Sequence, residues 1–119
     1  MMNEPAAEPP TWEDARSHAE VLRAQGVDVR INEQWMLILI RDGNGELHDS
    51  DDGTPAVQGF HHDGRPMQIG HYRNGNYHDP ADGTPAWQTF YPDGTPEAIE
   101  HWTNGKLVSE ERFPPIGEA

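Results

Sequence analysis

The sequence predicts an α+β fold, with one N-terminal helix followed by an antiparallel β-sheet. Three observations predict it: an amphipathic segment near the N-terminus, two apolar segments of strand length after it, and a 30-residue repeat rich in Asp-Gly and Asn-Gly pairs. The 119 residues suit a single domain. We expect it at residues 11–112, between a disordered tail at 1–10 and a C-terminal tail at 113–119.

Residues 11–26 predict the helix. Thr11 is a good N-cap residue, and Gly26 is a plausible residue for ending the helix. The segment has an apolar stripe at helical spacing, which it can bury against the sheet. The stripe consists of Trp12, Ala15, Ala19 and Leu22.

Residues 27–46 predict a β-hairpin. Residues 27–31 (VDVRI) alternate with a period of two, as a half-buried strand does. Residues 35–41 (WMLILIR) are the most apolar segment, so we expect them to form the best-buried strand. The turn Asp42-Gly43-Asn44-Gly45 follows.

The next sixty residues are two copies of one unit, residues 47–76 and 77–106. Sixteen of the thirty aligned positions are identical, without gaps. The segment DGTPA recurs at 52–56 and 82–86. Asp-Gly and Asn-Gly pairs favour tight turns, because glycine adopts positive φ at little cost. Each copy therefore predicts two strands and two turns. The expected strands are 56–60 and 67–72 in the first copy, and 86–90 and 97–102 in the second. The acidic DGTP segments are expected to be turns first.

The repeats resemble MORN-type repeats, and they look closest to the bacterial antitoxin-like variant. The residues that carry the resemblance are 60–64 (FHHDG) and 90–94 (FYPDG), each followed by a strand and then by 71–75 (HYRNG) or 101–105 (HWTNG). The resemblance covers residues 43–108. It implies β-hairpins stacked into one elongated sheet that serves as a binding scaffold rather than as an enzyme.

Composition limits the partners. The net charge of −13 repels nucleic acid and anionic lipid, so we expect no direct nucleic-acid binding and no membrane binding. The same charge favours a basic protein partner. The absence of cysteine excludes disulfides, and residues 1–10 lack the features of a secretory signal, so a cytoplasmic location is expected.

Aromatic side chains and repeated carboxylates are the candidate partner-binding residues. Trp87 and Phe90 lie three positions apart in one expected strand, so they should face opposite sides of the sheet. One helix can cover one face, which leaves an aromatic patch on the other. The candidate set is Tyr72, Trp87, Phe90, Tyr91, Trp102, Asp49, Asp51, Asp52, Asp79 and Asp82.

The acidic and histidine residues allow three chemical interpretations. The pairs His48-Asp49 and His78-Asp79 are similar to parts of metal-dependent hydrolases, but contacts within turns explain them better. The run 49–53 does not fit a calcium loop, because position twelve of that loop would be Phe60. Zinc would need convergence of the strand histidines, which we expect to face solvent instead. These are His61, His62, His71 and His101.

The sequence therefore favours a non-enzymatic acidic protein-binding module, an inhibitor of the antitoxin or immunity type. We expect no catalytic residue, no metal and no cofactor. A phage-type nucleic-acid mimic, directed against CRISPR or restriction proteins, is the alternative that the acidity suggests. A metal-dependent hydrolase using the His-Asp pairs is the second alternative. An open sheet edge could also pair with a second copy to form a dimer.

Overall fold

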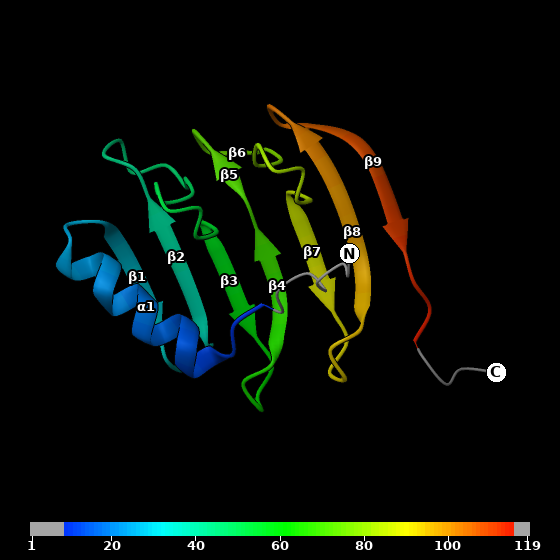
Figure 1. The fold of residues 1–119 in the computed structure, drawn as a ribbon, viewed down its shortest axis with the longest axis horizontal. Helices are drawn as coiled ribbons and strands as arrows, with labels where there is room; N and C mark the ends of the chain where they lie inside the picture. The colour runs from blue at the N-terminus through cyan, green and yellow to red at the C-terminus, as the bar shows by residue number, and fades with distance from the viewer. Residues whose placement is uncertain (1–8, 116–119) are drawn as a thin grey trace, which may run out of the picture.

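The computed structural model describes residues 9–115 as one helix and one large antiparallel sheet (Figure 1). This confirms the predicted fold class. Residues 1–8 and 116–119, which include most of both expected tails, lie outside the described residues. The elements are α1 (Trp12–Ala24), β1 (Asp28–Asn32), β2 (Leu37–Arg41), β3 (Val57–Phe60), β4 (Pro66–Gly70), β5 (Tyr72–Arg73), β6 (Asn76–Tyr77), β7 (Trp87–Phe90), β8 (Pro96–Thr103) and β9 (Lys106–Arg112).

The sheet is a meander in which neighbours in sequence are neighbours in space. Its seven strands have the order β1-β2-β3-β4-β7-β8-β9, and all pairs are antiparallel. The short strands β5 and β6 pair with each other as a separate hairpin. The long acidic loops before β3 and β7 therefore reach the same end of the sheet, the upper end in Figure 1.

Helix α1 buries the predicted stripe against the first three strands. Ala15, Ala19 and Leu22 are buried. They form one core cluster with Val29, Ile38, Ile40 and Phe60. The Trp12 ring meets the Phe60 ring edge-on at 5.4 Å, and the Trp12 backbone N–H donates to the Gly64 carbonyl at 2.8 Å. The start of the helix is thus tied to the turn that follows β3.

Both predicted helix ends are close to the observed ones. Thr11 is the N-cap residue, although its side chain makes no capping hydrogen bond. The carbonyl of Thr11 accepts the Ala15 N–H at 2.9 Å. Gly26 has φ +93°, the left-handed conformation that commonly ends a helix. The predicted range 11–26 therefore extends one residue before the helix and two residues after it.

The expectation of a strand over 35–41 is wrong at its first two residues. Trp35 and Met36 belong to the turn between β1 and β2, and Trp35 is 70% exposed. Met36 has φ +51°. Ile38 and Ile40, in contrast, are the largest fully buried side chains. The apolar segment is therefore longer than the strand, because its first two residues belong to the tight turn after Asn32.

Strand pairing in the repeats differs from the expectation in two places. In the first copy, the expected strand 67–72 divides into β4 and β5, and His71 lies between them. In the second copy, β8 continues unbroken and pairs with β9. Strand β9 is not predicted from the sequence, and its residues are all exposed. Its polar sequence, KLVSEER, has no buried face that alternation could reveal.

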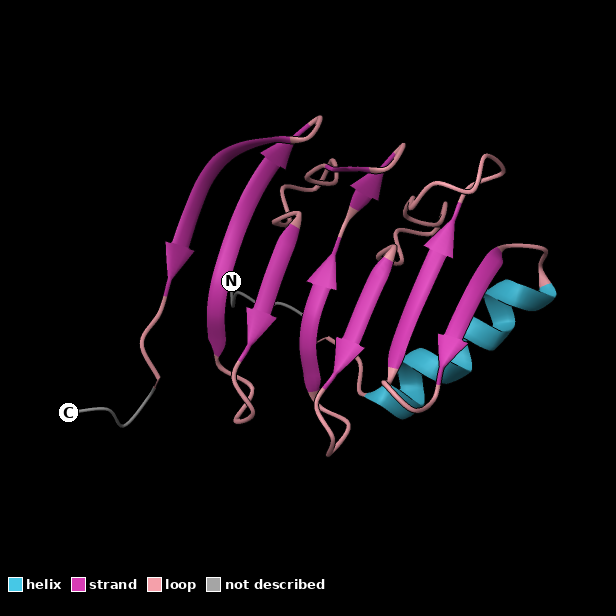
Figure 2. Cartoon of the chain, turned by 180° about the vertical axis from the view of Figure 1, so that it is seen from behind, coloured by secondary structure: helices cyan, strands magenta, loops and turns pink. Residues whose placement is uncertain are grey.

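The register shows which side chains share the face covered by α1. Ile38, which is buried under the helix, pairs with Gln58, and Gln58 pairs with Ile69. Ile69 in turn pairs with Gln88. Because side chains alternate along a strand, Trp87 faces the opposite side. Figure 2 shows that within residues 9–115 no helix covers this opposite face.

None of the described residues forms a helix that is both long enough and apolar enough to cross a membrane.

Replacing Leu22 by Ala should lower the free energy of unfolding by about 2–5 kcal/mol, because the substitution leaves a cavity in the core. Leu22 is 4% exposed. Its neighbour Val21 is 51% exposed, so Val21→Ala is the matched control and should change stability by less than about 0.5 kcal/mol. Urea unfolding followed by circular dichroism measures both. Equal losses would contradict the placement of α1 on the sheet.

Candidate functional site

The carboxylate of Asp49 joins three separate parts of the first repeat. One oxygen, Oδ1, accepts the backbone N–H of Ala56 at 2.9 Å and that of Tyr72 at 3.0 Å. The other oxygen, Oδ2, lies 2.6 Å from Nδ1 of His71. Asp49 therefore holds the start of β3 and the start of β5 together, and it fixes the orientation of a buried imidazole.

Asp79 repeats the arrangement in the second copy. Its Oδ1 accepts from the N–H of Ala86 at 2.8 Å and of Trp102 at 3.0 Å, and its Oδ2 lies 2.7 Å from Nδ1 of His101. The two clusters differ in burial. The His71 side chain is 8% exposed, whereas that of His101 is 33% exposed. The first cluster is thus the more sheltered of the two.

The histidines of the His-Asp pairs hold the Asn-Gly turns. Nδ1 of His48 accepts the N–H of Asn74 at 3.0 Å, and Nδ1 of His78 accepts that of Asn104 at 3.0 Å. Asn74 and the following Gly75 have φ +50° and +81°, as a two-residue hairpin turn requires. The beginning and end of each repeat are therefore bonded together, and both His-Asp pairs make turn contacts.

The strand histidines do not all face solvent, which corrects the expectation. His71 is 6% exposed, and Nε2 of His61 lies 2.9 Å from the carbonyl of Phe90. Among residues 9–115 there is no group of three or more His, Cys, Asp or Glu side chains that could hold a metal ion. His48, Asp49, His78 and Asp79 do line one shallow depression of about 310 Å³, but each of them bonds to the backbone.

The first DGTP turn contacts the helix. Asp52 accepts hydrogen bonds from the hydroxyls of Ser50 and Thr54, and its Oδ2 lies 2.8 Å from Nε2 of His18 on α1. Partial burial acts to raise the pKa of Asp52, but these hydrogen bonds outweigh it and hold the pKa well below its ordinary value. In the second turn, the hydrogen bonds from Thr84 lower the pKa of Asp82.

Four aromatic rings gather on the sheet face opposite α1. Tyr77 lies at the centre, with ring centroids 4.6 Å from Tyr72, 5.7 Å from Trp87 and 5.0 Å from Trp102. All four are half-buried. Burial, with the neighbouring Tyr77 hydroxyl, raises the pKa of Tyr72. We call Tyr72, Tyr77, Trp87 and Trp102 the aromatic cluster.

The aromatic cluster packs against Gly70, where a larger residue would clash with two of its rings. A Cβ atom at Gly70 would lie 3.0 Å from the Tyr72 ring and 3.3 Å from the Trp87 ring. The second repeat has Glu100 at this position, and its carboxylate accepts the indole N–H of Trp102 at 2.9 Å. Tyr77 was absent from the candidate residues. The first repeat has Leu47 at the equivalent position. This change from an aliphatic to an aromatic side chain was the signal that could have identified Tyr77.

The remaining two aromatic candidates lie elsewhere. Phe90 lines a groove together with Gln88 and residues of α1, so it faces the helix side of the sheet. Trp87 and Phe90 therefore face opposite sides, as predicted. The Tyr91 hydroxyl donates to the carbonyl of Phe113 at 2.5 Å. The structure thus brings together Tyr72, Trp87 and Trp102, and it separates them from Phe90 and Tyr91.

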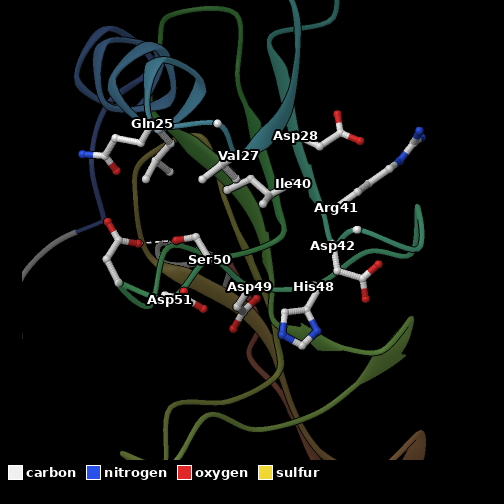
Figure 3. Close-up of a pocket in the computed structure, with 14 residues that line it drawn as sticks. Gln25, Val27, Asp28, Ile40, Arg41, Asp42, His48, Asp49, Ser50 and Asp51 are labelled. Atoms are coloured by element: carbon white, nitrogen blue, oxygen red, sulfur yellow. Dashed lines mark hydrogen bonds between the residues drawn. The ribbon is translucent and has the colours of Figure 1, made fainter.

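An acidic pocket of about 580 Å³ lies beside the C-terminal end of α1 (Figure 3). Asp28 comes from β1, Asp42 from the turn after β2, and Asp49 and Asp51 from the following loop. Arg41 also lines it. The negative end of the helix dipole adds to this potential. Of the candidate carboxylates, Asp51, Asp52 and Asp82 are exposed, whereas Asp49 and Asp79 are half-buried in their hydrogen-bond clusters.

In comparisons with known proteins, no protein-family model matches the sequence, and no curated protein and no solved structure gives a significant match. The likeness of the two repeats to MORN-type repeats therefore stays a prediction.

Replacing Asp49 by Ala should lower the free energy of unfolding by about 2–4 kcal/mol, because it leaves two backbone N–H groups and a buried imidazole without their acceptor. Asp79→Ala should cost less, since His101 is more exposed than His71. The exposed Asp51 is the matched control, and Asp51→Ala should cost less than about 0.5 kcal/mol. Thermal or urea unfolding of the three variants tests this order, and equal losses would refute it.

The carboxyl group of Asp52 should titrate below that of Asp82 in carbon-13 NMR. Proline replaces Ser50 in the second repeat, so Asp82 lacks one of the hydroxyl donors. Ser50→Ala should raise the pKa of Asp52 toward that of Asp82. Because folding lowers this pKa, ionised Asp52 stabilises the fold above about pH 4, and that contribution is lost as the pH falls through the folded value. An unchanged titration in Ser50→Ala would contradict the assignment.

Proposed function

We propose that this protein is a non-enzymatic, acidic protein-binding module of the antitoxin or immunity type, built on MORN-like repeats. The observation that supports the proposal best is the aromatic cluster. Its four half-buried rings lie on the sheet face that no helix covers within residues 9–115. Clustered Trp and Tyr side chains are enriched at the centres of protein–protein interfaces.

Charge indicates what kind of partner would bind there. The carboxylate of Glu100 already bonds the Trp102 indole, and Asp79 bonds the Trp102 backbone. With a net charge of −13, the chain would attract a basic partner over a distance and orient it before contact. The aromatic rings would then supply the anchoring area and the carboxylates the specificity.

The acidic pocket favours the second candidate, a nucleic-acid mimic that blocks a basic nucleic-acid-binding protein. Carboxylates from β1 and from two loops line this pocket beside a helix C-terminus. Such a mimic would depend on charge far more than on aromatic contacts. Salt therefore separates the two candidates, because screening weakens exposed charge pairs and leaves apolar burial largely intact.

Affinity capture from a lysate of the source organism should recover a basic partner with the wild-type protein and lose it with Trp87→Ala/Trp102→Ala. Trp35 provides the matched control, because it is 70% exposed and lies in a turn away from the cluster. Trp35→Ala should retain the partner. Circular dichroism and thermal unfolding must first show that the double variant is folded, and Trp102→Gln replaces it if it is not.

The outcomes separate the readings. Loss of the partner with the folded cluster variant, at both low and high salt, supports the aromatic surface. Retention with the cluster variant but release by salt, together with loss in Asp28→Asn/Asp51→Asn, supports mimicry. Equal loss with Trp35→Ala and with the cluster variant would overturn the proposed surface.

A further inference from the structure

A groove of about 840 Å³ crosses the helix side of the sheet next to α1. Its floor is formed by Gln58 on β3, Ile69 on β4 and Gln88 on β7, which pair directly with one another across the strands. The two DGTP segments line the groove through Pro55 and Pro85. This surface is separate from the aromatic cluster, which lies on the other face.

Two buried polar side chains of the groove have unused hydrogen-bonding groups. Gln58 is 4% exposed, and its side-chain amide makes none of the side-chain hydrogen bonds found within residues 9–115. None of the fully buried side-chain nitrogen and oxygen atoms of the described residues lacks a partner, so the amide atoms of Gln58 are open to the groove. His71 is 6% exposed, and Asp49 engages its Nδ1, so its Nε2 is left to the groove. Burying an amide without a partner costs free energy. A ligand that covered these groups would therefore have to bond them.

The spacing of the two glutamines fits one kind of ligand backbone. Gln58 and Gln88 are two strands apart, which corresponds to about 9.5 Å at the usual strand separation. A polyproline II helix repeats every three residues, about 9.3 Å, and it leaves its carbonyl groups free for external donors. A ligand in this conformation that ran across the strands would therefore present equivalent carbonyls to both amides.

The charges at the groove select a basic ligand. Asp14 and Asp52 line it together with His18 and His71, and His18 contacts Asp52. No Lys or Arg lines it within the described part of the chain. The low pKa of Asp52 keeps that carboxylate ionised. The chain's own segment 1–8 contains prolines but also Glu4 and Glu8, which the two aspartates would repel. A cationic segment of another protein fits better.

We infer that this groove binds a proline-rich, arginine- or lysine-bearing segment of a partner protein in the polyproline II conformation. Gln58 and Gln88 hold its backbone carbonyls, and Phe90 and the prolines pack against its rings, as aromatic-lined grooves do with such segments. Asp14 and Asp52 pair with its cation. The inference deepens the proposed binding role by naming the partner's chemistry, but it places the contact on a different surface.

The test titrates the full chain with a peptide of repeated Pro-Pro-Arg triplets, by calorimetry and by NMR of the side-chain amides. The wild type should bind it saturably, with shifts of the Gln58 and Gln88 amide signals. Gln58→Leu should weaken binding about tenfold, equivalent to about 1.4 kcal/mol, without loss of stability, because the Gln58 amide makes none of the side-chain hydrogen bonds found within residues 9–115. Gln68→Leu is the matched control, since Gln68 lies on the opposite face beside Gly59 and should bind normally.

Peptide variants test each part of the inference. A Pro-Pro-Glu peptide should not bind, and Asp52→Asn should weaken binding of the Pro-Pro-Arg peptide. Equally tight binding of a Gly-Ser-Arg peptide would overturn the polyproline requirement, since charge alone would then explain the attraction. Tighter binding to a chain without residues 1–8 would show that the chain's own segment fills the groove, which would also overturn it.

The Trp87→Ala/Trp102→Ala variant separates the two proposals. If it binds the peptide normally but captures no partner, the groove is supported independently of the aromatic surface. If the wild type captures a partner through the aromatic cluster but does not bind the peptide, the groove inference fails and the proposed function stands.

Discussion

The carboxylates of Asp49 and Asp79 hold the acidic loop of each repeat against the strands that follow it. Each one accepts two backbone N–H groups and contacts one imidazole, and these three groups come from segments seven to twenty-three residues away. Without these carboxylates, the backbone N–H groups around each acidic loop would have no hydrogen-bond acceptor inside the protein. One ionised side chain per repeat therefore fixes the loop, the next strand and the end of the hairpin together. The acidity of these loops is in this respect structural.

The same constraint separates two kinds of carboxylate. Asp49 and Asp79 are saturated by their own repeat, so little of their charge is available to a partner. Asp51 and Asp82 are exposed, and Asp52 binds both its own turn and His18 on the helix. A surface can thus be highly acidic while the carboxylates that recur in both repeats stabilise the fold. A partner would contact the exposed carboxylates. These differ between the two copies, because Ala81 replaces Asp51 in the second.

The helix, the meander and the turns could be predicted because their signals are local. The stripe from Trp12 to Leu22 and the Asn-Gly pairs each act over a few residues. The Asp49–His71 contact could not be predicted, because it joins positions twenty-two residues apart and depends on register. The repeat did contain the signal, since both members of the pair recur in the second copy. Trp35 was misplaced for the opposite reason: a local apolar run concealed a turn.

The two repeats have the same fold, but helix α1 packs against only the first of them. This difference accounts for the groove. In the first repeat, Phe60 lies under Trp12 at the start of α1. In the second, the equivalent Phe90 extends beyond the helix and lines the groove instead. A repeat unit keeps the same large side chain on this face whether or not the helix reaches it. The part of the sheet beside the helix therefore keeps a groove in which Ile69 and Phe90 lie among the amides of Gln58 and Gln88. A short helix on a longer sheet leaves this groove uncovered without any added element.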